Sequence, residues 1–527
     1  MTTSLSNAPE TSEATRTGEP PIVPDTTGAP PAAPPPPGRP PRTTNAPESP
    51  RTLVSRFILL VLCLAVMLST LAFGAAQAWA LAFFQAGAGL VALLWIVDAW
   101  RTRQFRLSRN LLQLPLLGLF IIGLVQLLPL GGITGGEATG GLTNAPANTL
   151  TLDPYATRFV LLQLGSLLIY FCATLVFTDS PARLRLIVRV ITVFGFLLAL
   201  YSMFQYFLNP TQIYWLRQPP FALPFGPFIN RHHFAAYMEL TLALPLGLLV
   251  SGAVAFERRL LYLFAVVIMS VALILTNSRG GILSLAAEVL FLVAIAGLVR
   301  RKKDKDQGEA EESPASSSRV RAALLRVSLG FALIVMLLVG AVFLGGEESL
   351  ARLLGTVNSN DPTSGRAQFW QGTWELIKHH PWLGAGLGAF SLAYTRYDVL
   401  NGAGRLEQAH NDYLQILADA GLAGGVLGLV FLFALFRYGV ARLNSQDTFR
   451  RGVAAGALAG CFAALVHSFF DFSLHMTSNA LLFLVLAAFA TLNGRVEEID
   501  TGRGSRRKRR KRSRSSTATG EDEVSAA

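Results

Sequence analysis

Charged residues are scarce in this sequence. Only 15% of its 527 residues are Asp, Glu, Lys or Arg, and 51% are hydrophobic, whereas a soluble domain carries about 25% charged residues. The scarcity is uneven, because long apolar runs alternate with short and often basic loops. This pattern excludes an ordinary soluble protein and predicts a polytopic membrane protein.

Cysteine is also rare. The three cysteines, Cys63, Cys172 and Cys461, all fall within apolar runs, so we expect neither a disulfide framework nor a metal site of cysteines. The sequence has no glycine-rich loop ending in Lys-Ser or Lys-Thr, which argues against nucleotide hydrolysis. The segments expected outside the cell hold no dense set of carboxylates for a divalent metal. We therefore expect no cofactor.

Basic residues exceed acidic ones by 45 to 33, a net charge of +12. They lie in loops and tails beside apolar runs, so we interpret them as topology signals and expect no nucleic-acid partner. Residues 1–52 form a Pro-rich arm that cannot bury a core and is expected to be disordered. We expect no cleavable signal peptide. The tail 495–527, with its run Arg506–Arg512, is predicted to be disordered and to face lipid headgroups in the cytosol.

The apolar runs predict an all-α fold of about twelve transmembrane helices, each near the ~20 residues that cross the hydrocarbon layer. Helices one to nine occupy 53–345, with a disordered cytosolic linker at 300–322. A large external loop subdomain, 346–412, separates spans nine and ten, and helices ten to twelve occupy 413–494. The predicted spans are 54–74, 78–98, 111–130, 158–178, 186–207, 233–255, 260–276, 281–299, 325–345, 413–436, 452–470 and 477–494.

Orientation follows from the basic residues. If both termini are cytosolic, every loop predicted to be inside is basic, and the two long outside loops, 131–157 and 346–412, are poor in clustered Lys and Arg. The basic residues of the inside loops are Arg101, Arg103, Arg106, Arg109, Arg183, Arg185, Arg258, Arg259, Arg300, Arg301, Lys302, Lys303, Arg437, Arg442, Arg450 and Arg451.

With this topology, several polar segments meet at the outer face of the membrane. They come from distant parts of the sequence, which makes a shared site the most economical interpretation. The segments are 226–233 (GPFINRHH), 276–281 (TNSRGG), 364–366 (SGR), 410–414 (HNDYL) followed by 420–424 (AGLAG), and a further group of His467, Asp471 and His475.

Arginines in these segments are candidate anion ligands. Arg279 is flanked by Ser278 and two glycines, which suit close backbone approach to a ligand, although an interfacial arginine can also simply snorkel to headgroups. Arg366 falls in the first turn of a helix predicted over 364–380, where a bound phosphate would offset its repulsion with the helix dipole. An ordinary surface arginine is the alternative. Arg231 is a weaker candidate of the same kind.

His410 is the candidate general base, since a neutral imidazole is the usual base near pH 7. It precedes a helix start that Asn411 or Asp412 would cap. A lone histidine is more often structural, but this one faces the same compartment as the arginines. Asp471 could orient it, and no spacing argument shows that the two meet. Asn411, Tyr413, Asp471 and His475 are expected to contact substrate.

These segments together resemble the O-antigen ligase and O-antigen polymerase family over about 226–430. The resemblance rests on Thr276-x-Ser-Arg-Gly280, Arg366 with Trp370, the run Pro381–Phe390 (PWLGAGLGAF), and His410-Asn-x-Tyr-Leu with Gly421-x-x-Gly424. One departure is Asp419, where the family often has Glu.

The resemblance implies a membrane glycosyltransferase with a type-C-like fold. Such enzymes move a glycan from a polyprenyl pyrophosphate donor to an acceptor hydroxyl, with inversion and usually without metal, on the outer face of the cytoplasmic membrane. The acceptor would be lipid A core or a similar lipid or glycan, and membrane lipids surround the protein. Arg279, Arg366 and His410 would be catalytic, and Arg231 would bind substrate.

Alternatives remain within and outside this class. A polymerase would use another polyprenyl-linked glycan as acceptor, and a protein O-oligosaccharyltransferase would use a Ser or Thr side chain. A small-anion transporter, for instance of bicarbonate, would place charged residues or broken helices near the bilayer midplane. The polar segments instead gather at one face, which favours the enzyme.

Topology is directly testable with reporter fusions. We expect a cytosolic signal after Arg106, Arg259, Lys303 and Arg512, because these follow basic inside loops. Fusions near Thr143 and Gly402 should report the outside. An outside signal at Lys303 would split the site residues between two compartments and contradict the topology.

Overall fold

A computed structural model describes residues 52–130, 149–220, 222–306, 366–398, 405–493 and 496–497. In these residues the chain is helical, with no strand longer than an isolated bridge. The helices are α1 (Leu53–Leu71), α2 (Ala78–Thr102), α3 (Gln113–Gln126), α4 (Pro154–Phe177), α5 (Pro181–Leu208), α6 (Arg231–Ser251), α7 (Phe256–Leu275), α8 (Arg279–Asp306), α10 (Arg366–His379), α11 (Phe390–Ala393), α12 (Asp412–Arg442), α13 (Thr448–His467) and α14 (Thr477–Thr491), with the short 3₁₀ helices η1 (Phe73–Ala75), η2 (Tyr394–Tyr397) and η3 (Ser473–His475).

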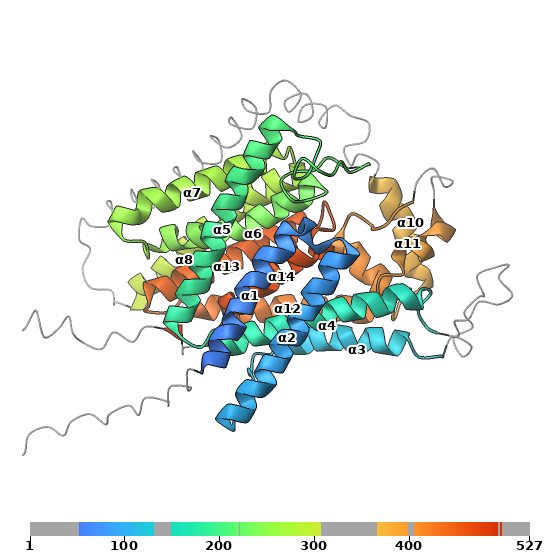
Figure 1. Cartoon of the computed structure of the whole chain (residues 1–527), viewed down its shortest axis with the longest axis horizontal. Helices are drawn as coiled ribbons and strands as arrows, with labels where there is room; N and C mark the ends of the chain where they lie inside the picture. The colour runs from blue at the N-terminus through green and yellow to red at the C-terminus, as the bar shows by residue number, and fades with distance from the viewer. Residues whose placement is uncertain are drawn as a thin grey trace, which may run out of the picture. The chain divides into compact units, whose positions relative to one another are not determined.

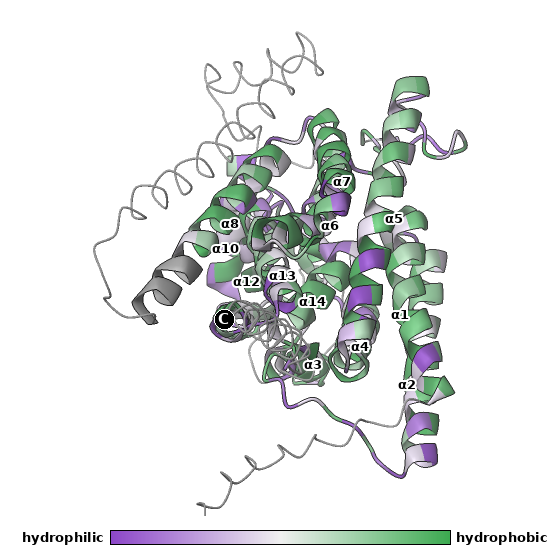
Figure 2. Ribbon diagram, turned by 90° about the vertical axis from the view of Figure 1, so that its left-hand side faces the viewer, coloured by the Kyte–Doolittle hydropathy of each residue, from purple (hydrophilic) through white to green (hydrophobic). Residues whose placement is uncertain are grey.

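The protein is a multi-pass membrane protein. Nine helices in the described ranges are long and apolar enough to cross a membrane. A helix covers most of each predicted span except 325–345, which lies outside the described residues. Figure 2 shows hydrophobic residues along most of α1 and α5.

Three helices differ in extent from the sequence prediction. α8 runs to Asp306, into the segment predicted as a disordered linker. α3 and α14 have only 14 and 15 residues, fewer than the ~20 of a full crossing. Every residue of α14 is buried, so its length is set by packing against other helices rather than by the hydrocarbon layer. Of the predicted arm (1–52) and tail (495–527), residues 1–51, 495 and 498–527 lie outside the described residues.

The two central helices are α13 and α14. α13 packs against α6 and α8, and α14 packs against α4 and α6. In Figure 1, α6, α7 and α8 lie on one side of this pair, and α1 to α4 lie on the other. Successive helices run in opposite directions. The first turns of α6, α8, α12 and α14 therefore lie at the same end of the bundle as the last turns of α7 and α13.

Backbone contact between α6 and α13 is made possible by glycine. α13 carries Gly452, Gly456 and Gly460 at four-residue spacing, and a Cβ on Gly456 would overlap the Ala243 carbonyl group of α6. A Cβ on Gly247 of α6 would likewise overlap the backbone of Gly456. Small residues at this spacing allow membrane helices to approach closely and gain van der Waals contact. This contact fixes how far along the axis of α6 the last turn of α13 lies.

A break in α12 explains two of the sequence motifs. At Gly421 the backbone adopts φ 63° and ψ −162°, a region that is essentially restricted to glycine. The segment 381–388 lies along the break and bonds to the freed backbone groups. The amide of Ala385 donates to Ala418 O (2.8 Å), and that of Leu422 donates to Pro381 O (2.7 Å). A side chain on Gly384 would overlap the backbone of Asp419.

Gln126 joins the end of α3 to this break. Its buried amide nitrogen donates to Leu383 O (2.6 Å) and Asp419 O (2.8 Å). Its amide oxygen accepts from the backbone of Leu387 (2.9 Å). Backbone groups buried without a hydrogen-bond partner are costly in a membrane. The side chain of Gln126 supplies a partner for three such groups of the broken helix and the glycine-rich segment.

The described part of the predicted 346–412 subdomain contains α10, α11 and η2. A small hydrophobic core holds it together, and this core includes Ala418 of α12. Trp370 of α10 donates its indole N–H to Ala409 O (3.1 Å), next to His410. The subdomain is therefore packed onto the start of α12.

Two arginines that we counted as topology signals are buried. Arg450 at the start of α13 is fully buried and donates to Leu492 O (2.9 Å) beyond the end of α14. Arg183 at the start of α5 donates to Ser55 Oγ (2.6 Å) of α1. Both lie at the end of the bundle opposite the site described below, and both cross-link helices there.

The α6–α13 contact predicts a sharp effect of one methyl group. Gly456→Ala should destabilise the protein by about 1–3 kcal/mol, the usual penalty for overpacking a dense interior, and lower the thermal midpoint of the detergent-purified protein. Gly428→Ala on α12 is the matched control, because a Cβ there meets nothing within 4 Å. Equal midpoints for the two variants would show that the backbone contact is not tight.

Candidate functional site

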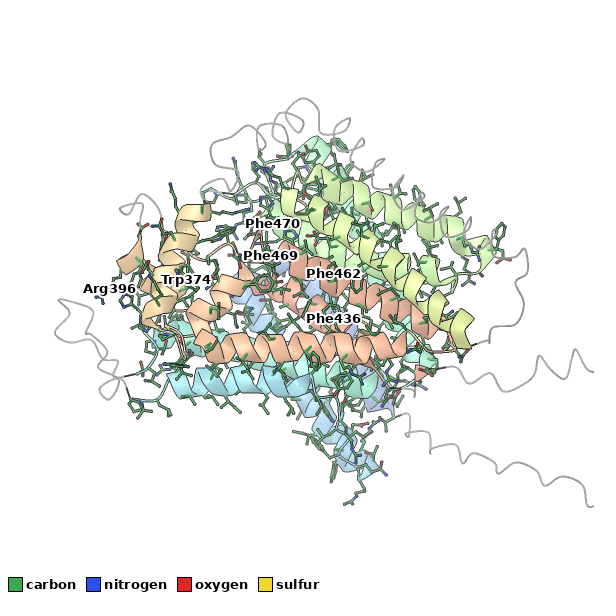
Figure 3. The ribbon with its side chains drawn as sticks, turned by 180° about the vertical axis from the view of Figure 1, so that it is seen from behind. Trp374, Arg396, Phe436, Phe462, Phe469 and Phe470 are labelled. Carbon is green, nitrogen blue, oxygen red and sulfur yellow. The ribbon has the colours of Figure 1, made fainter. Side chains whose placement is uncertain are left out.

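The polar segments singled out in the sequence meet where α6, α8 and α12 begin and α13 ends. We call this group the polar cluster: Arg231, His232, His233, Ser278, Arg279, Arg366, His410, Asp412, Asp471 and His475. In Figure 3, Phe469 and Phe470 of the turn after α13 lie between Phe462 of α13 and the segment that carries Trp374 and Arg396. The ring of Phe472 packs edge-on against the rings of His233 and His410, with ring centroids 4.9 Å and 4.8 Å apart.

His410 and Asp471 form a pair. The Nδ1 atom of His410 lies 3.1 Å from Asp471 Oδ1, and the histidine side chain is 28% exposed whereas that of Asp471 is 2% exposed. Burial would raise the pKa of Asp471, but the hydrogen bond from His410 and the nearby His233 and His232 lower it well below its usual range. A charged Asp471 holds the proton on Nδ1 and leaves Nε2 of His410 to accept another.

A second pair lies beside the first. Asp412, the first residue of α12, places Oδ1 2.8 Å from Nδ1 of His475 in η3. Its other oxygen accepts from Ser468 Oγ (2.8 Å). Burial would lower the pKa of His475, but the hydrogen bond and the charge of Asp412 outweigh it and raise the pKa. This pair fastens the turn after α13 to the start of α12.

Asn411 and Tyr413 hold the backbone in place around His410. Asn411 caps α12 by accepting from the amides of Tyr413 (3.0 Å) and Leu414 (3.1 Å). Its amide nitrogen donates to Phe469 O (3.3 Å), and the Tyr413 hydroxyl donates to Leu465 O (2.7 Å). His410 itself has a φ of 50°, so the capped helix start aims its ring. The substrate contacts predicted for Asn411 and Tyr413 stay a prediction.

Ser278 connects α8 to α6. Its hydroxyl oxygen accepts from the amide of Gly281 (3.2 Å) in the first turn of α8 and lies 2.8 Å from Nδ1 of His232. The side chain of the next residue, Arg279, is exposed at the helix start. The sequence Ser-Arg-Gly therefore buries a capping serine and presents a guanidinium group beside the backbone N–H groups that favour anions.

Arg366 completes the basic side of the polar cluster. It is the first residue of α10 and half-buried. Burial lowers the pKa of Arg366, while the charge of Asp471 raises it and that of Arg279 lowers it. Arg366 therefore lies within electrostatic range of both Asp471 and Arg279. The charge of Arg231 acts electrostatically on its neighbour His232 at the start of α6.

The arrangement combines two functions. Guanidinium groups at two helix starts can hold a phosphate-containing anion by charge and by paired hydrogen bonds. Within reach of the same charges, an imidazole oriented by a buried carboxylate can take a proton. In the described residues no three His, Cys, Asp or Glu side chains are grouped to hold a metal ion.

Sequence reasoning missed two buried carboxylates below the polar cluster, Glu239 of α6 and Glu288 of α8, both fully buried. Nδ1 of His467 lies 2.8 Å from Glu239 Oε1. The available signal was simple: a single carboxylate inside an apolar span is rare and is a functional candidate by default.

Comparison with known proteins gives one family. The family model described as O-antigen ligase matches residues 264–432, from within α7 to within α12. The match contains Ser278, Arg279, Arg366 and His410, and it confirms the predicted resemblance. Asp471 and His475 lie beyond it and reach the polar cluster through the fold. No curated protein matches the chain.

The Asp412–His475 pair predicts a pH dependence of stability. Since the folded pKa of His475 is raised, the pair stabilises fully below the unfolded value of about 6.5, and this contribution is lost as pH rises through the folded pKa. The thermal midpoint of the parent should therefore fall between pH 6 and pH 9 by more than that of His475→Gln. His379→Gln, at an exposed histidine of α10, is the control. Parallel curves for parent and His475→Gln would contradict the pairing.

Proposed function

We propose that this membrane protein, whose residues 264–432 match the O-antigen ligase family model, transfers a glycan from a polyprenyl pyrophosphate donor to an acceptor hydroxyl. The reaction takes place at the polar cluster, on the outer face of the cytoplasmic membrane. The observation that carries the proposal is the His410–Asp471 pair within electrostatic range of Arg366.

The donor suits a site at the ends of membrane helices. Its polyprenyl chain is soluble in the bilayer, and its pyrophosphate belongs at the interface. Arg279 and Arg366 stabilise the pyrophosphate as negative charge develops on the leaving oxygen, the role that preorganised charge performs in many enzymes. Guanidinium forks suit this role because they bind phosphate oxygens in pairs.

The chemical step is a displacement at the anomeric carbon. Nε2 of His410 takes the proton from the acceptor hydroxyl, and the acceptor oxygen forms a bond to the anomeric carbon. The bond from that carbon to the pyrophosphate oxygen breaks, and the polyprenyl pyrophosphate leaves with the electron pair. Attack opposite the leaving group inverts the configuration. Asp471 keeps the His410 ring oriented and stabilises the imidazolium that forms.

The acceptor separates the related activities. A ligase uses lipid A core or a similar lipid, a polymerase uses another polyprenyl-linked glycan, and a protein O-oligosaccharyltransferase uses a Ser or Thr side chain. We propose the ligase. A purified donor offered with each acceptor in turn distinguishes them.

The arginines and the histidine should differ in what they do. Arg279→Lys and Arg366→Lys keep the charge but lose the fork, so each should weaken donor binding and lower kcat/KM by about ten- to a thousandfold. His410→Ala should retain donor binding while transfer falls by about a hundred- to ten-thousandfold, the usual range for loss of a general base. Donor binding and transfer are measured separately on purified, monodisperse variants.

Matched controls come from the subdomain next to the polar cluster. Arg396→Lys in η2 and His379→Ala in α10 change exposed residues of the same types and should leave both measurements at the parent level. Normal transfer by His410→Ala would remove it as the base and leave His475 as the next candidate. If both Arg→Lys variants bind the donor and transfer the glycan like the parent, the assigned pyrophosphate site is wrong. A transporter would then be the better interpretation.

A further inference from the structure

Three titratable side chains are buried below the polar cluster, inside the membrane-spanning bundle. They are Glu239 of α6, Glu288 of α8 and His467, the last residue of α13. Their side chains are 0–1% exposed. Each comes from a different helix, and α13 packs against both α6 and α8. The proposed transfer reaction uses none of them.

Their hydrogen bonding is incomplete. The contact between His467 Nδ1 and Glu239 Oε1 (2.8 Å) satisfies one atom of each residue. Glu239 Oε2, His467 Nε2 and both carboxyl oxygens of Glu288 are buried with no hydrogen-bond partner. Glu239 and Glu288 also act on each other electrostatically. A buried charge without a partner is strongly unfavourable, and two neighbouring carboxylates cannot both ionise cheaply.

A bound proton resolves this conflict. One proton on the carboxyl groups removes the like-charge repulsion, and a second on His467 neutralises the remaining carboxylate. We propose that Glu239, Glu288 and His467 form a proton-binding site inside the membrane-spanning bundle, coupled to the polar cluster above it.

Other occupants fit the surroundings less well. The described residues contain no group of three His, Cys, Asp or Glu side chains arranged to hold a metal ion. A purely structural cross-link would be expected to satisfy its polar atoms, as Gln126 does at the α12 break. Ionisable residues inside membrane spans are rare, and proton relays are among the functions that they mark.

His467 connects this site to the polar cluster. Its ring lies against the start of α8, because a Cβ on Gly280 would lie 3.3 Å from His467 Nε2, and Gly280 follows Arg279. The carbonyl of His467 accepts from the amide of Asp471 (3.1 Å). The charged or titratable groups that act on His467 or respond to it from neighbouring elements are Glu239, His232 and His233 of α6, Asp412 of α12 and Asp471. α14 carries no ionisable residue.

The coupling has a defined sign. An anion held by Arg279 places negative charge above His467, which favours protonation of the groups below. Pyrophosphate binding should therefore draw a proton into the site. This step rests on the proposed function, whereas the existence of the proton site does not.

Infrared spectroscopy tests the site without donor or acceptor. Exposed carboxyl groups titrate near pH 4, so at pH 7.5 the C=O stretch of a protonated carboxylic acid reports only strongly perturbed groups. We expect this band in the purified full-length parent and its reduction in Glu288→Gln. Glu407→Gln, at a 65% exposed glutamate, should leave the band unchanged. Because Asp419 is also buried, the assignment rests on the difference between variants.

Glu288→Asp guards against a folding defect, since it keeps a carboxylic acid and should shift the band rather than delete it. Absence of the band from the parent at pH 7.5 would overturn the proposal. So would a band of parental intensity in both Glu288→Gln and Glu239→Gln.

Proton uptake in weak buffer tests the coupling, with farnesyl pyrophosphate as the probe. For each farnesyl pyrophosphate bound, the parent should take up more protons than Glu288→Gln, by up to about one. Glu407→Gln should match the parent. Equal uptake by parent and Glu288→Gln, with binding intact, would overturn the coupling. Failure of the probe to bind any of the proteins would count against the pyrophosphate site, and the infrared result would still decide the proton site.

Discussion

Direct backbone contact between α6 and α13 is the constraint on which the site depends. Gly456 and Gly247 leave no room for a side chain between the two helices, so the end of α13 has one depth in the bundle. That depth brings His467 to Glu239 and sends the following turn across the start of α12. Asp471 then meets His410, and Asp412 meets Ser468 and His475. The geometry of the polar cluster is thus set by residues without side chains, about three helical turns before the end of α13.

The charges of the polar cluster and of the carboxyl groups below it form a layered arrangement. Exposed and half-buried guanidinium groups are outermost, imidazole–carboxylate pairs lie beneath them, and the carboxyl groups of Glu239 and Glu288 are deepest. Three histidines bond through Nδ1 to a carboxylate. Such pairing places negative charge among the arginines and histidines and so reduces the repulsion between them.

Much of the architecture could be predicted from the sequence, because apolar runs and basic loops report the membrane directly. The helix start at Asp412 follows from the local capping signal at Asn411, and the structure confirms it. Asp471 was a candidate to orient His410, but the sequence could not show that the two meet, since 61 residues separate them and only the packing of α13 brings them together. The roles of Gln126 and of the 381–388 segment were equally hidden, because nothing in a sequence announces that a helix will break at Gly421. The burial of Arg450 was also hidden: a charge beside a span looks like a topology signal, and the sequence does not show that it cross-links two helix ends as well.

The break in α12 also determines how the protein can be recombined with its relatives. Pro381, Trp382 and Ala385 bond to backbone groups on both sides of Gly421, and Gln126 of α3 bonds to both segments. A chimera joined between residues 388 and 412 would separate the two halves of this interface and pair each with a foreign backbone. Exchange of the whole segment from Pro381 to Gly424, with Gln126 kept in the host, would instead carry the interface across intact.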